Sequence, residues 1–189
     1  QSDRLPLYPL LLAFFYSIFG QWFFLIRVFQ ALLGALTIWF LIQLGKRILP
    51  EPISYLGGFL AAVYPAFLWY YGPSFILTET VFIFTVVLSI ERASALRENA
   101  SVGRAIGLGV ALAACSLTKG LGNFLAVFVL GYLAFFCSWS WRIKGARLGV
   151  SFLIMLVCLA PWLVRNYGLY GSWIYSTKGE HVFWESNNP

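Results

Sequence analysis

The sequence predicts an all-α protein, a polytopic transmembrane helix bundle, and its composition and apolar runs carry that prediction. Of the 189 residues, 60% are hydrophobic and 19% are aromatic, whereas only 11% are charged. Soluble domains carry about 25% charged residues, so this chain lacks the charges to cover a water-facing surface. Several apolar runs are also long enough for a helix to cross a bilayer. We therefore expect an integral membrane protein with the lipid bilayer as a partner.

Seven apolar runs define the expected helices. The first, residues 5–19, is shorter than the about 20 residues that a span needs, so we expect a short re-entrant or interfacial helix there. The other six runs are expected to span the membrane: residues 23–44, 53–71, 75–90, 105–117, 121–136 and 148–164. The expected fold is therefore a bundle of about six spans plus one short helix, of the kind that a chain with this much apolar sequence can form.

The chain is expected to divide into three regions. Residues 1–21 would form the end of an outer loop together with the short helix, and residues 22–164 would form the transmembrane helix bundle. Residues 165–189 are polar and aromatic, and we expect them to begin a following outer loop.

Glycine, proline and charged residues separate the first four runs. Gly20 ends the first run, and the basic residues 46–47 end the second before the prolines of residues 50–52 break the chain. Gly72-Pro73 is expected to form the turn between the third and fourth runs.

Polar segments separate the later runs. Residues 91–104 are expected to form a polar loop after the fourth run, and Thr118-Lys119-Gly120 interrupts the apolar sequence after the fifth. Residues 139–147 are expected to form a basic, aromatic loop before the last run, and Pro161 lies near the exit of that run.

Basic residues are concentrated in three expected loops, near residues 46–47, 92–104 and 142–147. These loops hold eight of the thirteen Lys and Arg residues. Loops rich in Lys and Arg stay on the cytoplasmic side of a membrane, so the six spans would alternate from that side. Cytoplasmic loops also account for the net charge of +6, and we expect no nucleic-acid partner.

The opposite side of the membrane then receives a group of residues that border the expected spans or lie in the outer segments. They include Arg4, Arg27, Glu79, Lys119, Arg165, Lys178 and His181. Charges at helix ends bordering the membrane need partners or a ligand, so this side is the expected place of a functional site.

Glu79 is the one charged residue between Glu51 and Glu91, and it lies in the first turn of the fourth run. A carboxylate near hydrocarbon costs about 2.5–3.5 kcal/mol, which favours a functional role. Glu79 could act as a general base, a metal ligand or the partner of a cation. The alternative is a polar residue that marks a helix end at the interface.

Two cations suit an anionic headgroup. Lys119 can hold a phosphate as a point charge, with the start of the following helix beside it, or it can extend to the interface. Arg4, followed closely by Tyr8, can face a phosphate or anchor the short helix at the interface.

The segment after the last run combines aromatic and amide side chains, which suit stacking on sugars and binding of hydroxyl groups. Arg165 and Asn166 begin this segment, and His181 and Asn187 lie near its end. Its turn glycines and its proline are also ordinary features of loops, and the residues alone leave both interpretations open.

Four segments resemble the GT-C class of polytopic membrane glycosyltransferases, specifically the dolichyl-phosphate-mannose–protein mannosyltransferase-like and aminoarabinose-transferase-like group. They are residues 4–9 (Arg-Leu-Pro-Leu-Tyr-Pro), Arg27 with residues 30–37 and 45–47, residues 77–79 (Leu-Thr-Glu), and residues 160–167 with 187–189. Leu117-Thr118-Lys119 supports the resemblance, which covers nearly the whole chain. The ending departs from the family pattern at Glu180, His181 and Ser186.

The resemblance implies an inverting glycosyltransferase that moves a sugar from a polyprenyl-phosphate-linked donor to a protein, lipid or polysaccharide acceptor. It also implies a multi-pass protein of the cell inner (plasma) membrane whose active site faces the periplasm or exterior. The principal catalytic aspartate of the family lies in the first outer loop, upstream of residues 4–9, and the resemblance implies that this chain starts too late to contain it. The chain begins at Gln1 without a Met and ends at Pro189 just after a polar, aromatic stretch, so both ends are expected to be cuts through a longer protein.

The resemblance also implies roles for particular residues. Glu79 would be the second acidic residue of the catalytic site. The substrate-binding residues would be Arg4, Tyr8, Lys119, Arg165, Asn166, His181 and Asn187. A divalent metal ion bound by Glu79 is left open as a cofactor.

Two other classes of function remain open. A transporter, flippase or polymerase component that handles lipid-linked saccharides without glycosyl transfer would also carry charges at helix ends. A membrane interaction scaffold would need neither Glu79 nor Lys119 for its role.

Overall fold

The structure, a computed structural model, describes residues 5–65 and 78–176, and every regular element in these residues is an α-helix. The helices are α1 (Leu7–Phe19), α2 (Phe23–Lys46), α3 (Glu51–Val63), α5 (Thr78–Glu98), α6 (Val102–Thr118), α7 (Leu121–Phe136) and α8 (Trp141–Tyr170). The predicted all-α fold is confirmed.

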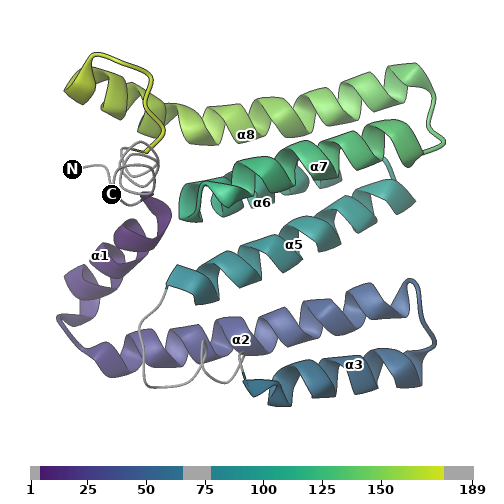
Figure 1. Cartoon of the computed structure of the whole chain (residues 1–189), viewed down its shortest axis with the longest axis horizontal. Helices are drawn as coiled ribbons and strands as arrows, with labels where there is room; N and C mark the ends of the chain where they lie inside the picture. The colour runs from purple at the N-terminus through teal and green to yellow at the C-terminus, as the bar shows by residue number, and fades with distance from the viewer. Residues whose placement is uncertain (1–4, 66–77, 177–189) are drawn as a thin grey trace, which may run out of the picture.

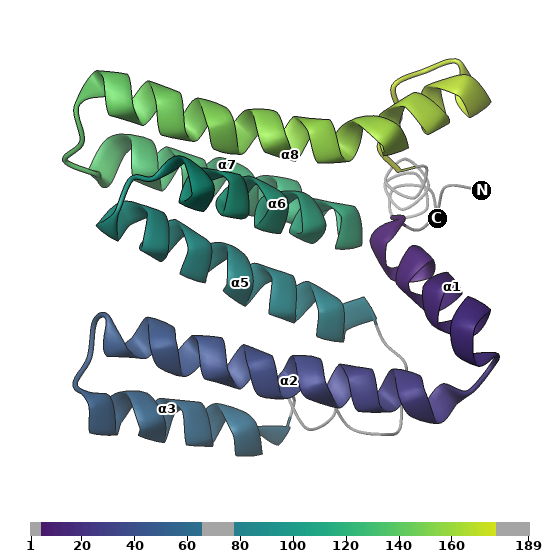
Figure 2. The same cartoon turned by 180° about the vertical axis from the view of Figure 1, so that it is seen from behind.

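The long helices run along one another as a bundle, and α1 lies across one end of it (Figures 1 and 2). Helix α6 packs against α5, α7 and α8, while α2 packs against α3 and α5. We call the end that carries α1 the α1 end. We call the opposite end, where the α2–α3, α5–α6 and α7–α8 turns lie, the basic end.

Helix α1 has 13 residues, as the short first run predicted. At about 1.5 Å of rise per residue it extends about 20 Å, well below the about 30 Å of hydrocarbon in a bilayer. It ends at Gly20, whose φ of 68° is a conformation that favours glycine. Its length and its position across the bundle end agree with a helix that does not span.

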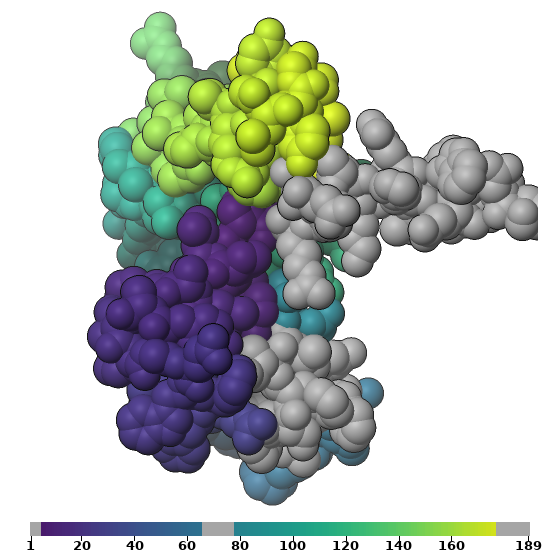
Figure 3. All heavy atoms as spheres, turned by 90° about the vertical axis from the view of Figure 1, so that its left-hand side faces the viewer, coloured from purple at the N-terminus to yellow at the C-terminus, as the bar shows by residue number. Residues whose placement is uncertain are grey.

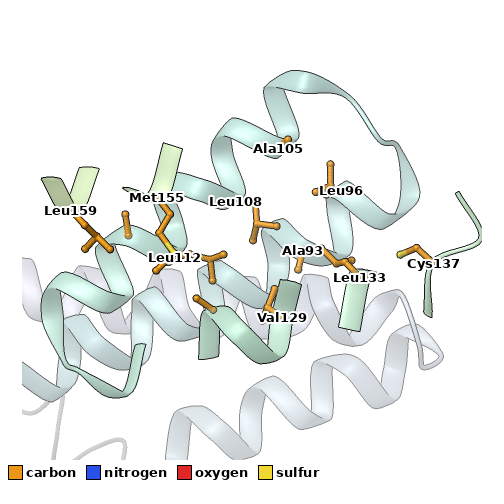
Figure 4. Packing of buried hydrophobic residues seen from close by; sticks show 12 residues of the cluster. Ala93, Leu96, Ala105, Leu108, Leu112, Val129, Leu133, Cys137, Met155 and Leu159 are labelled. Atoms are coloured by element: carbon orange, nitrogen blue, oxygen red, sulfur yellow. The ribbon is translucent and has the colours of Figure 1, made fainter. Parts of the chain in front are cut away.

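The main core lies between α5, α6, α7 and α8. Leu96, Leu108, Leu112 and Leu133 are each 0% exposed, and Figure 4 shows the core side chains of these four helices pointing toward one another. Between membrane helices, close packing of such side chains supplies most of the association energy, because lipid is as apolar as leucine. These four helices therefore share one packed core.

The closest approach of two helices occurs where Gly109 of α6 faces α8. A Cβ atom at Gly109 would lie 2.5 Å from the Ser151 carbonyl oxygen and 2.9 Å from the Cβ of Ile154. The Ser151 hydroxyl also donates a hydrogen bond to the Ala105 carbonyl at 2.9 Å. The absence of a side chain at Gly109 thus lets the two backbones meet, as small residues do in membrane bundles.

Cations at the basic end bind the C-terminal carbonyls of helices. The Arg104 guanidinium donates to the Ala95 carbonyl of α5 at 2.5 Å, and the Lys144 ammonium donates to the Ala134 carbonyl of α7 at 2.8 Å. The last carbonyls of a helix carry partial negative charge, so cations stabilise them. These two cations at the basic end therefore stabilise the ends of α5 and α7.

Helix α5 is longer than the sequence predicted. Residues 91–104 were expected to form a loop, but α5 continues to Glu98, so the predicted end at Ile90 is wrong. Glu91 is only 8% exposed, and its carboxylate contacts Arg47 at 3.0 Å and Arg92 at 3.1 Å. These contacts neutralise the buried Glu91 carboxylate, and α5 can therefore continue beyond its apolar run with Glu91 inside the bundle.

Helix α8 also extends past both ends of its apolar run. The basic loop expected at residues 139–147 is helical from Trp141, and the helix continues through Pro161 to Tyr170. Hydropathy reports how deep a segment lies in the membrane, whereas a helix ends where backbone geometry changes. Here that change is at Gly171, whose φ of 67° is left-handed.

The bundle surface is apolar. Within the described residues, α2 and α8 are the helices long and apolar enough to cross a membrane, and only 28% and 17% of their most apolar windows are buried. Phe128 and Phe135 on α7 are 74% and 84% exposed. Such surfaces require lipid, so the chain forms a helical membrane bundle.

The Gly109 contact predicts a difference between two alanine variants of α6. Gly109→Ala should lower the midpoint of thermal unfolding in detergent by an amount equivalent to about 1–3 kcal/mol, because the added methyl overlaps α8. Gly107→Ala is the matched control, because its Cβ would come no closer than 3.7 Å to Arg92 and alanine favours helices. Equal midpoints for the two variants would contradict the close contact.

Candidate functional site

An ion pair joins α5 to α6 at the α1 end. The Lys119 ammonium nitrogen lies 2.7 Å from Oε1 of Glu79. Glu79 is in the first turn of α5, and Lys119 directly follows the last residue of α6. The two residues are 40 positions apart, and they meet because α5 begins where the antiparallel α6 ends.

The ion pair is half-buried. The Lys119 side chain is 34% exposed and the Glu79 side chain 33% exposed. The ammonium nitrogen lies 5.5 Å from the centroid of the Phe82 ring, a distance that suits a cation–π contact. An ammonium group has three N–H donors, so a cation paired with one carboxylate oxygen can still donate to a second anion on its exposed side.

The turn between α6 and α7 fixes the position of Lys119. The backbone of Lys119 is extended, with φ −145° and ψ 144°, and its N–H still caps the Cys115 carbonyl at 3.2 Å. A Cβ atom at Gly122 would lie 2.5 Å from the Cys115 backbone, so glycine lets the turn close. Helix α7 begins at Leu121, and its N-terminus adds partial positive charge beside the ammonium.

Helix α1 covers the same end of the bundle, as Figure 3 shows in purple. Tyr8 is 5% exposed and packs in a cluster with Leu33 of α2 and Val81 of α5. Because Val81 is two residues after Glu79, this cluster fixes α1 beside the first turn of α5. Tyr8 therefore lies at the same end as the ion pair, within a packed cluster.

Residues 171–176, which we call the strap, fold back from the end of α8. The indole N–H of Trp162 donates to the Tyr175 carbonyl at 2.9 Å. The side-chain amide of Asn166 donates to the Ile174 carbonyl, also at 2.9 Å. Two side chains of α8 thus hold the backbone of the strap.

Arg165 and Asn166 both lie next to the strap, at the α1 end. Asn166 is 0% exposed, so its amide group supports the strap from within the protein. Arg165 is exposed, lies 5.0 Å from the Trp162 ring centroid and donates to the Asn166 side-chain oxygen at 3.2 Å. Arg165 therefore lies at the end that carries the ion pair.

The structure places five of the predicted site residues at the α1 end: Glu79, Tyr8, Lys119, Arg165 and Asn166. It brings Glu79 and Lys119 into direct contact. The other predicted site residues, Arg4, His181 and Asn187, lie outside the described residues. The roles of all eight residues stay predictions.

Tyr175 is a residue that the sequence did not single out. Its hydroxyl donates a hydrogen bond to the Ser116 carbonyl of α6 at 2.5 Å. Burial raises the pKa of Tyr175 to about 12, against the lowering effect of a hydrogen bond with Asn123, so the hydroxyl keeps its proton and remains a donor. Ser116 and Tyr175 are 59 positions apart, and no local pattern pairs residues at that separation.

The described part of the site suits an anion better than a metal ion. Among the described residues, no group of three or more His, Cys, Asp or Glu side chains could hold a metal. The Glu79 carboxylate is bound to an ammonium, which competes with any cation for the same oxygen atoms.

The fold and the ion pair define a polytopic helical membrane protein with a charged site where helices end. The model of one family, described as dolichyl-phosphate-mannose-protein mannosyltransferase, matches residues 3–164. The chain belongs to this family. The resemblance drawn from the sequence is confirmed, and membership indicates a glycosyltransferase of the GT-C type in a membrane setting. No curated protein and no solved structure matches the chain.

The strap predicts a local effect of Asn166→Ala. Losing the buried amide leaves the Ile174 carbonyl without its donor, which costs about 1–3 kcal/mol. Amide hydrogen exchange of a peptide covering residues 171–176, measured by mass spectrometry, should therefore rise by about tenfold or more. Asn99→Ala, at an exposed asparagine of the basic end, is the control and should leave this exchange unchanged. Unchanged exchange in Asn166→Ala would show that Asn166 does not hold the strap.

Proposed function

We propose that the protein transfers a sugar from a polyprenyl-phosphate-linked donor to a hydroxyl group of a protein, lipid or polysaccharide acceptor. The observation that supports this most is the contact between Glu79 and Lys119 at 2.7 Å. Family membership supplies the class of reaction, and this contact supplies a position for the phosphate of the donor.

Lys119 binds and stabilises the leaving group in this proposal. As the bond between the sugar and the phosphate breaks, negative charge grows on the phosphate oxygen atoms. A cation already held at that position, with the N-terminus of α7 beside it, stabilises this charge without reorganisation. A phosphate needs little protonation to leave, so a cation serves the step better than a general acid.

Glu79 acts as the second acidic residue. Its carboxylate orients the ammonium of Lys119 from one side, which leaves the other side of that group for the phosphate. The same carboxylate can accept a hydrogen bond from the acceptor hydroxyl and so bring it toward the donor. Both roles require the charge of Glu79 as well as its shape.

The chemical step is a single displacement. A base takes the proton of the acceptor hydroxyl, and the oxygen attacks the anomeric carbon as the carbon–oxygen bond to phosphate breaks. The products are a glycoside of inverted configuration and polyprenyl phosphate. The family resemblance assigns the base to an aspartate of the first outer loop, while Lys119 and Glu79 would provide the cation and the second acid.

The site would face the outside of the cytoplasmic membrane. Arg97, Arg142 and Lys144 lie at the basic end, and loops rich in Lys and Arg stay in the cytoplasm. The α1 end, with Glu79 and Lys119, would then open to the periplasm or exterior. In this orientation α1 lies at the outer interface.

Removing either charge of the ion pair should reduce sugar transfer. Lys119→Gln removes stabilisation of the leaving phosphate, which typically costs about 10²–10³-fold in kcat, and Glu79→Gln should cost at least about tenfold. Transfer would be measured with full-length protein in membranes, using a radiolabelled polyprenyl-phosphate sugar. The thermal unfolding midpoint of each variant should stay within a few degrees of the wild type, because half-exposed ion pairs contribute only about 1 kcal/mol.

Arg142→Gln is the matched control, since this exposed cation lies at the basic end. Its transfer rate should equal that of the wild type. Wild-type transfer by Lys119→Gln would remove the support for the proposal. If the wild type moved lipid-linked saccharide across vesicle membranes and transferred no sugar, a transporter or flippase function would be favoured instead.

A further inference from the structure

The end of α6 contains a carbonyl that the helix itself cannot satisfy. The Ser116 carbonyl would normally accept from the N–H group four residues on, but the extended backbone of Lys119 turns the chain away. Ser116 is 0% exposed, so water cannot serve as the donor. A buried carbonyl without a donor costs free energy comparable to a lost hydrogen bond.

The hydroxyl of Tyr175 supplies that donor, at 2.5 Å. It also contacts Asn123 in the first turn of α7, so one side chain meets α6 and α7 on either side of the Lys119 turn. The tyrosine ring packs against the main core of α5 to α8, which restricts its movement.

The strap holds Tyr175 in this position. The Tyr175 carbonyl accepts a hydrogen bond from the Trp162 indole, and the neighbouring Ile174 carbonyl accepts one from the Asn166 amide. Both donors belong to α8, whose backbone is packed against α6 at Gly109. A connected set of contacts therefore runs from α8 through the strap to the last turn of α6.

The geometry points to Tyr175 as a positioning residue for Lys119. By binding the Ser116 carbonyl, the Tyr175 hydroxyl fixes the turn that aims the Lys119 ammonium at Glu79 and at the donor phosphate. Without the hydroxyl, the carbonyl is left without its donor and the turn has more than one arrangement of similar energy. The ammonium then spends less time where a phosphate meets it, while the helices remain packed.

This inference rests on the proposed role of Lys119 in binding phosphate, and the test separates the two. The probe is farnesyl phosphate, a short polyprenyl phosphate, and its dissociation constant is measured on the full-length protein in detergent micelles, with farnesol as the uncharged control. Tyr175→Phe keeps the ring and removes only the hydroxyl. We expect it to weaken farnesyl phosphate binding by about three- to tenfold, the range that one hydrogen bond supports, and to leave farnesol binding unchanged.

Two further variants make the result specific. Tyr132→Phe is the matched control, because it removes a tyrosine hydroxyl that contacts Arg97 at the basic end, and it should bind as the wild type does. Lys119→Gln should weaken binding more strongly than Tyr175→Phe. Adding Tyr175→Phe to Lys119→Gln should then cause no further loss, because a positioning residue has nothing left to position.

The outcomes distinguish the claims. If Lys119→Gln weakens binding but Tyr175→Phe has no effect, or has the same effect with and without Lys119, the positioning role is overturned and the phosphate role of Lys119 stands. If Lys119→Gln binds farnesyl phosphate as tightly as the wild type, both claims fail.

Discussion

The contact between Glu79 and Lys119 is the constraint on which the site depends. The two charges are half-exposed and meet in a single contact, so the packing of α5 against α6 must place them in register. That packing continues deeper in the bundle, where residues such as Leu96 of α5 and Leu108 of α6 belong to the same core cluster. The main effect of the ion pair is therefore to hold a cation at a defined place, because half-exposed pairs add little stability.

The two ends of the bundle use charge differently. At the basic end, Arg104 and Lys144 bind helix carbonyls and Arg47 binds a carboxylate, so these three cations have partners within the protein. At the α1 end, Lys119 is held by one carboxylate and keeps about a third of its side chain exposed. A cation that is held but still accessible is suited to an anionic ligand, which agrees with a family that uses lipid-linked sugar donors.

Much of the fold could be predicted from the sequence, because apolar runs mark the membrane-embedded part of most helices. The span expected at residues 53–71 is an exception, since α3 ends at Val63. The run at residues 121–136 matches α7 at both ends. The ends of α5 and α8 could not be predicted in this way. In α5, the buried Glu91 is neutralised by Arg47 and Arg92, and hydropathy does not report such contacts. For the site, charge counting placed Glu79 and Lys119 on the same side of the membrane, but their direct contact depends on how α5 and α6 pack. The link between Tyr175 and Ser116 depends on a chain reversal at Gly171 and leaves no trace in local sequence.

The central claim is that Glu79 and Lys119 act as one unit in sugar transfer. A double-mutant cycle over Glu79→Gln and Lys119→Gln, measured as kcat/KM with a polyprenyl-phosphate sugar, tests it most directly. Residues that act as a unit give strongly non-additive effects, so the double variant should be about as impaired as the worse single variant. A double variant whose loss equals the product of the two single losses would contradict the claim, because the two charges would then act independently.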